Sequence, residues 1–105
     1  MTTLVIHAPT SKVVSELKRS FENTLKTCIG DGYALTKSER AQISTGCKVI
    51  VIDKDTGKMA EARLVKLEHD SWTKNGIERF NVFMSDIQRV GYRSIALNRR
   101  GVALI

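Results

Sequence analysis

The segment from Cys47 to Ile52 restricts the fold more than any other part of the sequence. It reads Cys-Lys-Val-Ile-Val-Ile, so apolar residues follow one another instead of alternating with polar ones. A strand with one face in water alternates apolar and polar residues, whereas a strand buried on both faces is continuously apolar. The segment therefore predicts a strand in the centre of a sheet.

The residues that follow predict hairpins. Asp53 to Gly57 has the composition of a turn, and Lys58 to Leu67 alternates enough to form the second strand of a hairpin. Asn75-Gly76 predicts another tight turn, before a strand from Ile77 to Phe83 or Met84. Ser85 to Gln88 fits either a capping box that opens one helical turn or an irregular continuation of the strand.

The last residues predict a further hairpin. Ser94 to Leu97 and Val102 to Ile105 are apolar arms on either side of Asn98-Arg99-Arg100-Gly101, which has the composition of a four-residue loop. We expect the two arginines to lie at the tip of this loop.

The N-terminal third predicts a strand and helices. Thr3 to Ala8 is β-branched, ends at Pro9 and predicts a first strand. A long amphipathic helix is predicted from Thr10 or Ser11 to Ile29, because apolar residues recur there at spacings of three and four, and it should stop by Gly30-Asp31-Gly32. Thr36 and Glu39 match a capping box, which predicts a short helix through Ile43.

These elements predict a single α+β domain that spans residues 1–105. Its sheet is expected to be mostly antiparallel and strongly bent, or closed as a small barrel, with one long N-terminal helix and one or two short helices. A length of 105 residues and a composition of 42% hydrophobic and 27% charged residues fit one globular domain without disorder.

Two segments carry a resemblance to a known family. Ser44 to Asp53, followed by Ala60 to Leu67, resembles the core hairpin of PUA-like domains of the EVE and ASCH groups, in which a glycine turn leads into an apolar strand. Cys47 stands where those domains often have an acidic residue, and the early Trp- or Tyr-rich segment of EVE domains is absent. The resemblance implies a pseudobarrel that binds RNA or modified DNA, or an accessory domain of nucleic-acid metabolism.

Positive charge is concentrated in the last third of this basic chain. Residues 71–105 contain six Lys and Arg but only two acidic residues, within a net charge of +6. Such a bias attracts polyanions, and the planar fork of arginine holds a phosphate by two hydrogen bonds. The residues predicted to contact nucleic acid are Arg89, Tyr92, Arg93, Arg99, Arg100, Trp72 and Lys74, with Arg79 adding to the field. The alternative is a charged surface that only keeps the protein soluble.

The two aromatic residues of this set have different interpretations. Trp72 and Tyr92 are candidates for stacking on bases. For Trp72 we favour the alternative that it folds back over the core, which is the commoner position of a lone tryptophan in a small domain.

The sequence offers little support for catalysis, a metal site or a cofactor. His7, His69, Cys28 and Cys47 are the only histidines and cysteines, and no CxxC or HxxxH spacing joins them. Both cysteines are expected to be reduced thiols. His69, Asp70 and Ser71 are adjacent in sequence and point in opposite directions in an extended chain, so they do not form a triad. No glycine-rich phosphate loop is present, so no nucleotide cofactor is expected.

The sequence analysis leads to a first and a second functional hypothesis. The first is a cytoplasmic, non-enzymatic domain that binds DNA, RNA or another polyanion through its basic C-terminal surface, without a membrane segment. The second is a homo-oligomeric protein-interaction or accessory module, in which the apolar residues Val102 to Ile105 form an edge strand that pairs with its own copy. A small enzyme acting on nucleic acid or nucleotides is a third, less favoured hypothesis.

Overall fold

The computed structural model describes residues 2–9, 20–53 and 55–105. The elements in chain order are β1 (Leu4–His7), α1 (Phe21–Thr27), β2 (Ile29–Ala34), α2 (Lys37–Ala41), β3 (Lys48–Asp53), β4 (Lys58–Trp72), β5 (Glu78–Val90) and β6 (Val102–Leu104). No helix in the described part of the chain combines the length and apolar content that crossing a bilayer requires.

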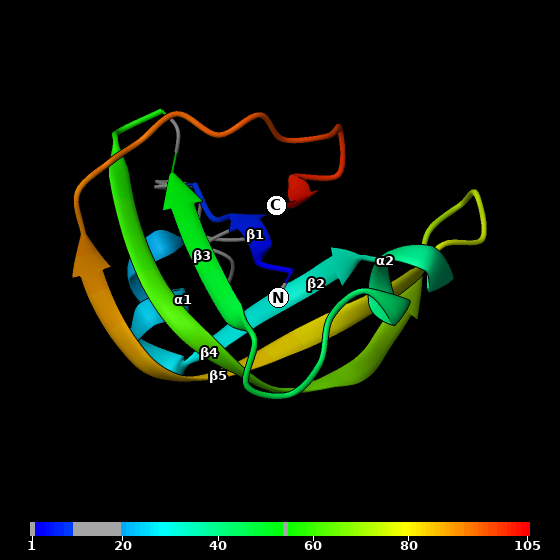
Figure 1. The fold of residues 1–105 in the computed structure, drawn as a ribbon. Coiled ribbons are helices and arrows are strands. Elements are labelled where there is room, and N and C mark those ends of the chain that lie inside the picture. The colour runs from blue at the N-terminus through cyan, green and yellow to red at the C-terminus, as the bar shows by residue number, and fades with distance from the viewer. Residues whose placement is uncertain (1, 10–19, 54) are drawn as a thin grey trace.

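The described strands form one sheet in the order β2-β5-β4-β3-β1-β6. Neighbouring strands are antiparallel except β1 and β3, which are parallel. The sheet curls into a half barrel, with β4 and β5 bending along the bottom of Figure 1. Register shifts between these two strands account for the bend, since a bulge increases local twist. The prediction of an α+β fold with a bent, mostly antiparallel sheet is therefore confirmed.

Apolar residues cover both faces of the central strand, as the Cys47 to Ile52 run predicted. Val49 and Val51 of β3 lie in the larger core cluster, together with Leu4, Ile6 and Phe21. Ile50 and Ile52, on the other parity, pack with Val5 and Met59 in a second cluster. Ile95 and Leu97, from the segment after β5, also pack against the second cluster. Both faces are buried because this segment covers the side that α1 leaves open.

The long N-terminal helix is a correction. The described helix α1 spans only Phe21–Thr27, and Ser20 has an extended backbone and caps it by accepting a hydrogen bond from the Asn23 amide. Residues 10–19, where the predicted helix begins, lie outside the described residues. The helix ends at Cys28 in a left-handed conformation, and Ile29–Ala34, predicted to contain the helix stop, forms strand β2. Pairing with β5 outweighs the local glycine signal, and Gly32 adopts a positive φ within a bulge of this strand.

The shorter elements agree better with the sequence. The capping box of Thr36 and Glu39 is present at the start of α2, because local side-chain and backbone groups are sufficient to form it. Strand β3 and strand β4 form the predicted hairpin, and Thr73–Ile77 contains the predicted tight turn. Ser85 to Gln88 continues as strand β5, the second alternative, with Asp86 at a φ of 54° as its irregular position.

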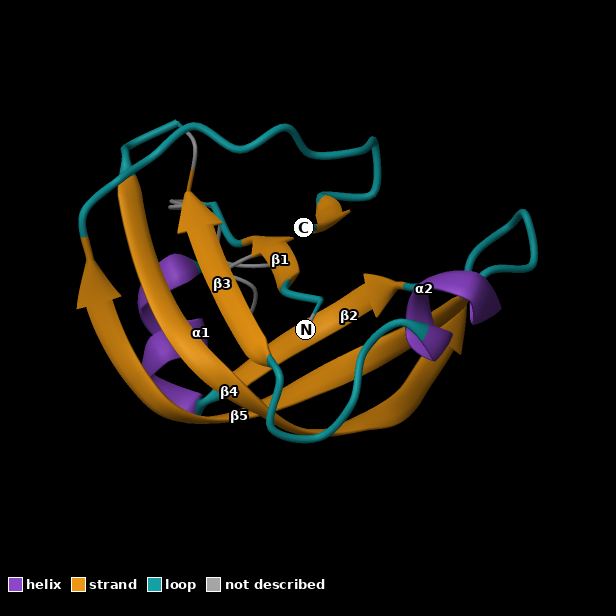
Figure 2. Ribbon diagram, in the orientation of Figure 1, coloured by secondary structure: helices purple, strands orange, loops and turns teal. Residues whose placement is uncertain are grey.

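The predicted C-terminal hairpin is only partly present. Asn98 to Gly101 forms a turn in which the Gly101 amide donates to the Asn98 carbonyl (3.0 Å). Residues 94–97 are not a strand, and β6 pairs with β1 instead. In Figure 2 the segment from β5 to β6 runs as a loop across the upper rim of the sheet. Ile95 and Leu97 of this segment pack in the second core cluster, and its backbone does not pair with β6 as a strand.

Candidate functional site

The structure divides the predicted nucleic-acid contacts between two ends of the C-terminal segment. Arg89, Tyr92 and Arg93 lie at or just after the end of β5, whereas Arg99 and Arg100 lie in the turn before β6. Figure 1 shows the end of β5 and this turn on opposite sides of the half barrel. The predicted basic face is therefore not one continuous cluster.

At the β5 end, the first arginine is already paired. Arg89 Nη2 donates to Glu22 Oε2 (2.6 Å), and its guanidinium lies over the ring of Phe21. Tyr92 is exposed, and its ring lies close to Gly57 of the β3–β4 turn. Arg93 is exposed and makes no hydrogen bond or ion pair with the described residues. This end therefore offers one free guanidinium and one exposed ring.

The other end contains a pocket of about 430 Å³ at the open side of the half barrel. The pocket lies where the ends of β1 and β2, the start of β5 and the turn before β6 meet. The described residues that line it are His7, Pro9, Ala34, Thr73, Arg79, Arg99, Arg100 and Gly101. Because three of the described lining residues are arginines, we call it the arginine pocket.

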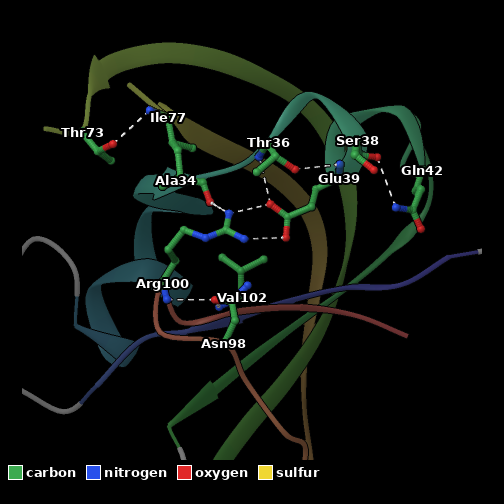
Figure 3. Close-up of polar contacts among 10 residues, drawn as sticks. All are labelled: Ala34, Thr36, Ser38, Glu39, Gln42, Thr73, Ile77, Asn98, Arg100 and Val102. Atoms are coloured by element: carbon green, nitrogen blue, oxygen red, sulfur yellow. Dashed lines mark hydrogen bonds and ion pairs between the residues drawn. The ribbon is translucent and has the colours of Figure 1, made fainter. Parts of the chain in front are cut away.

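Arg100 forms part of the wall of the arginine pocket. Its Nη1 donates to the Ala34 carbonyl (2.7 Å) and to Glu39 Oε1 (2.5 Å), and its Nη2 donates to Glu39 Oε2 (3.0 Å), as Figure 3 shows. Glu39 is held in place by the capping box, in which its Oε1 also accepts from the Thr36 amide. Arg100 thus connects the last turn to the β2–α2 connection. The two N–H groups that it donates to Glu39 are not available to a ligand.

The same contacts act on the ionisation of Glu39. Burial raises the pKa of this carboxyl group, but the hydrogen bonds from Arg100 and the Thr36 amide outweigh burial and hold the pKa below its ordinary value of 4.5. Glu39 is therefore ionised at neutral pH and neutralises the charge of Arg100.

Among the described lining residues, Arg79 and Arg99 supply the net positive charge of the pocket. Arg79 Nη1 donates to the Gly32 carbonyl (3.2 Å), a group that the bulge in β2 takes out of the strand ladder. Arg99 is exposed and has no hydrogen-bond or ion-pair partner among the residues that the structure describes. Since a phosphate needs donors without competing acceptors, Arg99 is the guanidinium best placed to take one.

The turn that carries Arg99 has a defined shape. Asn98 Oδ1 accepts from the amides of Arg100 (2.9 Å) and Val102 (3.2 Å), and closes the turn from inside. Gly101 has a φ of 72°, and a Cβ atom at this position would lie 3.3 Å from His7 Cβ. Glycine is required here by both backbone conformation and close approach to β1.

Trp72 and Lys74 lie near the pocket without lining it. The expectation that Trp72 folds over the core is wrong, because this residue is 62% exposed at the end of β4 and its ring contacts the ring of His69. Trp72 pairs with Glu78, and Ser71 pairs with Arg79. Because successive side chains alternate across a strand, Trp72 and Arg79 point to opposite faces of the hairpin. Lys74 is exposed in the adjoining turn.

His7 and Arg79 are pocket residues that the site prediction left out. The sequence predicts Arg79 only as a contribution to the positive field, and it offers His7 only as a candidate for catalysis or a metal site. The position of Arg79 at the start of a predicted strand is a signal that could have identified it. The sequence around His7 contains no signal that β1 lies beside the last turn.

A second cluster of polar side chains lies beside His7. Potential metal-ligand atoms of His7, Asp53 and Asp55 are within 4.8 Å of one another. The buried Asp53 already accepts hydrogen bonds from the Asp55 amide (3.0 Å) and from Thr56 Oγ1 (2.6 Å), and His7 Nδ1 is paired with the Ile52 carbonyl (3.0 Å). These contacts give the cluster a structural role in the β3–β4 turn. Cys28 and Cys47 are both free thiols.

Comparisons with protein-family models, curated proteins and solved structures give no match for this chain. The resemblance to PUA-like domains therefore stays a prediction, and the functional argument depends on the geometry of the arginine pocket.

Proposed function

We propose that this chain is a nucleic-acid-binding domain whose principal phosphate contact is Arg99 in the arginine pocket. The observation that carries the proposal is the meeting of Arg79, Arg99 and Arg100 around one cavity in a chain of net charge +6. Arginine donors that border a cavity hold phosphate oxygens in a fixed direction, whereas scattered surface charges only attract them.

The pocket arginines have separate roles in this proposal. Arg99 contacts the phosphate, and Arg79 contributes the donors that are not used for the Gly32 carbonyl. Arg100 is a positioning residue, because its contacts with Glu39 and Ala34 fix the wall of the pocket. The proposal is for binding and not for catalysis, since cationic donors hold an anion without supplying a nucleophile.

The test compares two arginines of equal charge in different places. Arg99→Ala and Arg93→Ala each remove one exposed, unpaired guanidinium, but only Arg99 lines the pocket. Fluorescence anisotropy with labelled single-stranded DNA, duplex DNA and RNA, from low salt to about 0.15 M, measures binding and its salt slope. We expect Arg99→Ala to weaken binding about tenfold and to reduce the salt slope by about one, with a smaller change for Arg93→Ala.

Equal losses for the two variants would show that net charge alone attracts the ligand and would remove the pocket from the proposal. Absence of binding by the unmodified protein to all three nucleic acids at low salt would contradict the proposal altogether.

The second hypothesis, dimerisation through the edge strand, receives less support from the geometry. Strand β6 is an edge strand. In an antiparallel pair, every second residue directs its backbone N–H and C=O groups at the neighbouring strand, and the residues between them direct these groups outward. Thr3 and Ile105 exchange hydrogen bonds, so the outward groups of β6 belong to Val102 and Leu104. The Val102 amide and carbonyl are already bonded to Asn98. Only Leu104 is left to pair with another strand, and light scattering in the binding buffer measures whether a dimer forms.

A further inference from the structure

We infer that the arginine pocket receives one nucleotide unit of a single strand, and that a duplex reaches only its rim. This inference rests on the proposed function, and it assigns the class of nucleic acid and the unit that is recognised.

The size of the pocket favours a ligand larger than phosphate. Its volume of about 430 Å³ lies within the range of roughly 300 to 1,000 Å³ that is usual for small-molecule sites. An inorganic phosphate ion would fill only a part of this space. A phosphate joined to a sugar and a base is the smallest part of a nucleic acid that uses the remainder.

The lining of the pocket has the mixed character that such a unit requires. Arg79 and Arg99 supply donors for the phosphate, and Thr73 adds a hydroxyl group. Pro9 provides apolar surface, which a bare anion would not use but a sugar or base ring would contact. The pocket therefore offers both charged donors and apolar surface.

The contacts of Arg100 leave the phosphate contact to the other two pocket arginines. Its guanidinium is fixed by Glu39 and the Ala34 carbonyl, and its charge is neutralised by Glu39. Among the described lining residues, the positive charge that a ligand meets comes from Arg79 and Arg99, so a phosphate is held by these two residues. The sugar and base then use the remaining space beside Pro9.

A duplex does not fit this arrangement. Double-stranded DNA is stiff over about 150 base pairs, and its bases are stacked inside the phosphate backbone. To place one nucleotide in the pocket, the duplex must unstack and unpair it, at a cost of a few kcal/mol. A single strand has only stacking to lose, so we expect single strands to bind more tightly than duplexes of equal charge.

The test uses competition with small ligands. A labelled oligonucleotide of about ten nucleotides is bound to the protein and displaced with a nucleoside 5′-monophosphate, with the unphosphorylated nucleoside or with inorganic phosphate. We expect the monophosphate to compete at least about tenfold better than either of the others, and Arg99→Ala to remove this advantage while Arg93→Ala keeps it. Amide NMR shifts of Ala34 and Gly101 on adding the monophosphate locate the ligand, and thermal unfolding confirms that both variants are folded.

The outcomes separate this inference from the proposed function. Preference for single strands, together with competition by the monophosphate, supports both. Equal binding of duplex and single strand without competition by the monophosphate would overturn the inference and leave nucleic-acid binding intact. A monophosphate that binds while all strands fail to bind would overturn both.

Discussion

Arg99 and Arg100 are neighbours of the same type, yet the structure gives them different tasks. Arg100 makes hydrogen bonds to Glu39 and Ala34, and Arg99 makes none with the described residues. Both residues belong to the turn that Asn98 closes, since Asn98 Oδ1 accepts from the Arg100 amide. A variant that replaces both together would confound loss of a ligand contact with loss of a structural tie, so single variants are required.

Asp53 is a residue whose removal should lower stability. Its carboxylate is fully buried and accepts hydrogen bonds from the Asp55 amide and Thr56 Oγ1. Asp53→Ala leaves these donors without their acceptor, which we expect to reduce the free energy of unfolding by about 1 to 3 kcal/mol. Urea denaturation measures the change.

Asp55→Ala is the matched control for this prediction. Asp55 contributes its backbone amide to the Asp53 contact, and the substitution retains that amide. We expect a change within about 0.5 kcal/mol, as for ordinary surface substitutions. A loss equal to that of Asp53→Ala would show that the turn depends on both carboxylates.

At the scale of elements, the sequence could predict those elements that are stabilised by contacts between residues close in sequence. The capping box of α2 was predictable because Thr36 and Glu39 satisfy each other within four residues. The helix predicted through Ile29 failed because Ile29 and Gly30 pair with Phe83 and Val82 of β5, a long-range contact that the periodicity does not record.

The same limit applies to the candidate site. The basic turn at Arg99 and Arg100 was visible in the composition, and the structure places it at a pocket. That Arg89 is paired with Glu22 of α1, and that His7 lines the same cavity as Arg99, depends on how distant segments pack. The sequence therefore predicted where positive charge is concentrated, but it did not predict which arginines form ion pairs.

The ion pair between Glu39 of α2 and Arg100 of the last turn predicts that the stability of the fold depends on pH. The pKa of Glu39 is lowered in the folded protein, so its ion pair stabilises the fold above the ordinary pKa of 4.5 and loses this contribution as the pH falls below that value. Between about pH 5 and pH 3, we expect the unmodified protein to lose more stability than Glu39→Gln, measured by urea denaturation.

Glu22→Gln is the control for this experiment. Hydrogen bonds from Arg89 and Lys58 also lower the pKa of Glu22, but its side chain is 54% exposed, against 16% for Glu39. Solvent screens an exposed pair, so Glu22→Gln should change the acid sensitivity less. The reverse order would show that Arg100 does not depend on Glu39.

At the scale of the whole molecule, the sheet combines local and distant pairings. The hairpins β3–β4 and β4–β5 join strands that are close in sequence, from Asp53 beside Lys58 and from Trp72 beside Glu78. The pair β1–β6 joins Leu4 to Leu104, and the arginine pocket lies at the end of this pair, where the His7 amide donates to the Gly101 carbonyl (2.8 Å). The pocket therefore depends on the most distant contacts of the chain.

This pairing has a kinetic consequence. Contacts between distant parts of a chain form late, because loop closure costs entropy before the contact repays it. We expect the β3–β4–β5 hairpins to form first and the β1–β6 pair last. In native-state hydrogen exchange, the amides of Thr3, His7 and Ile105 should exchange through smaller opening free energies than those of β3. Equal protection would show that the pair opens only when the whole domain unfolds. With unequal protection, a ligand held between His7 and Arg99 would slow the first step by which this molecule comes apart.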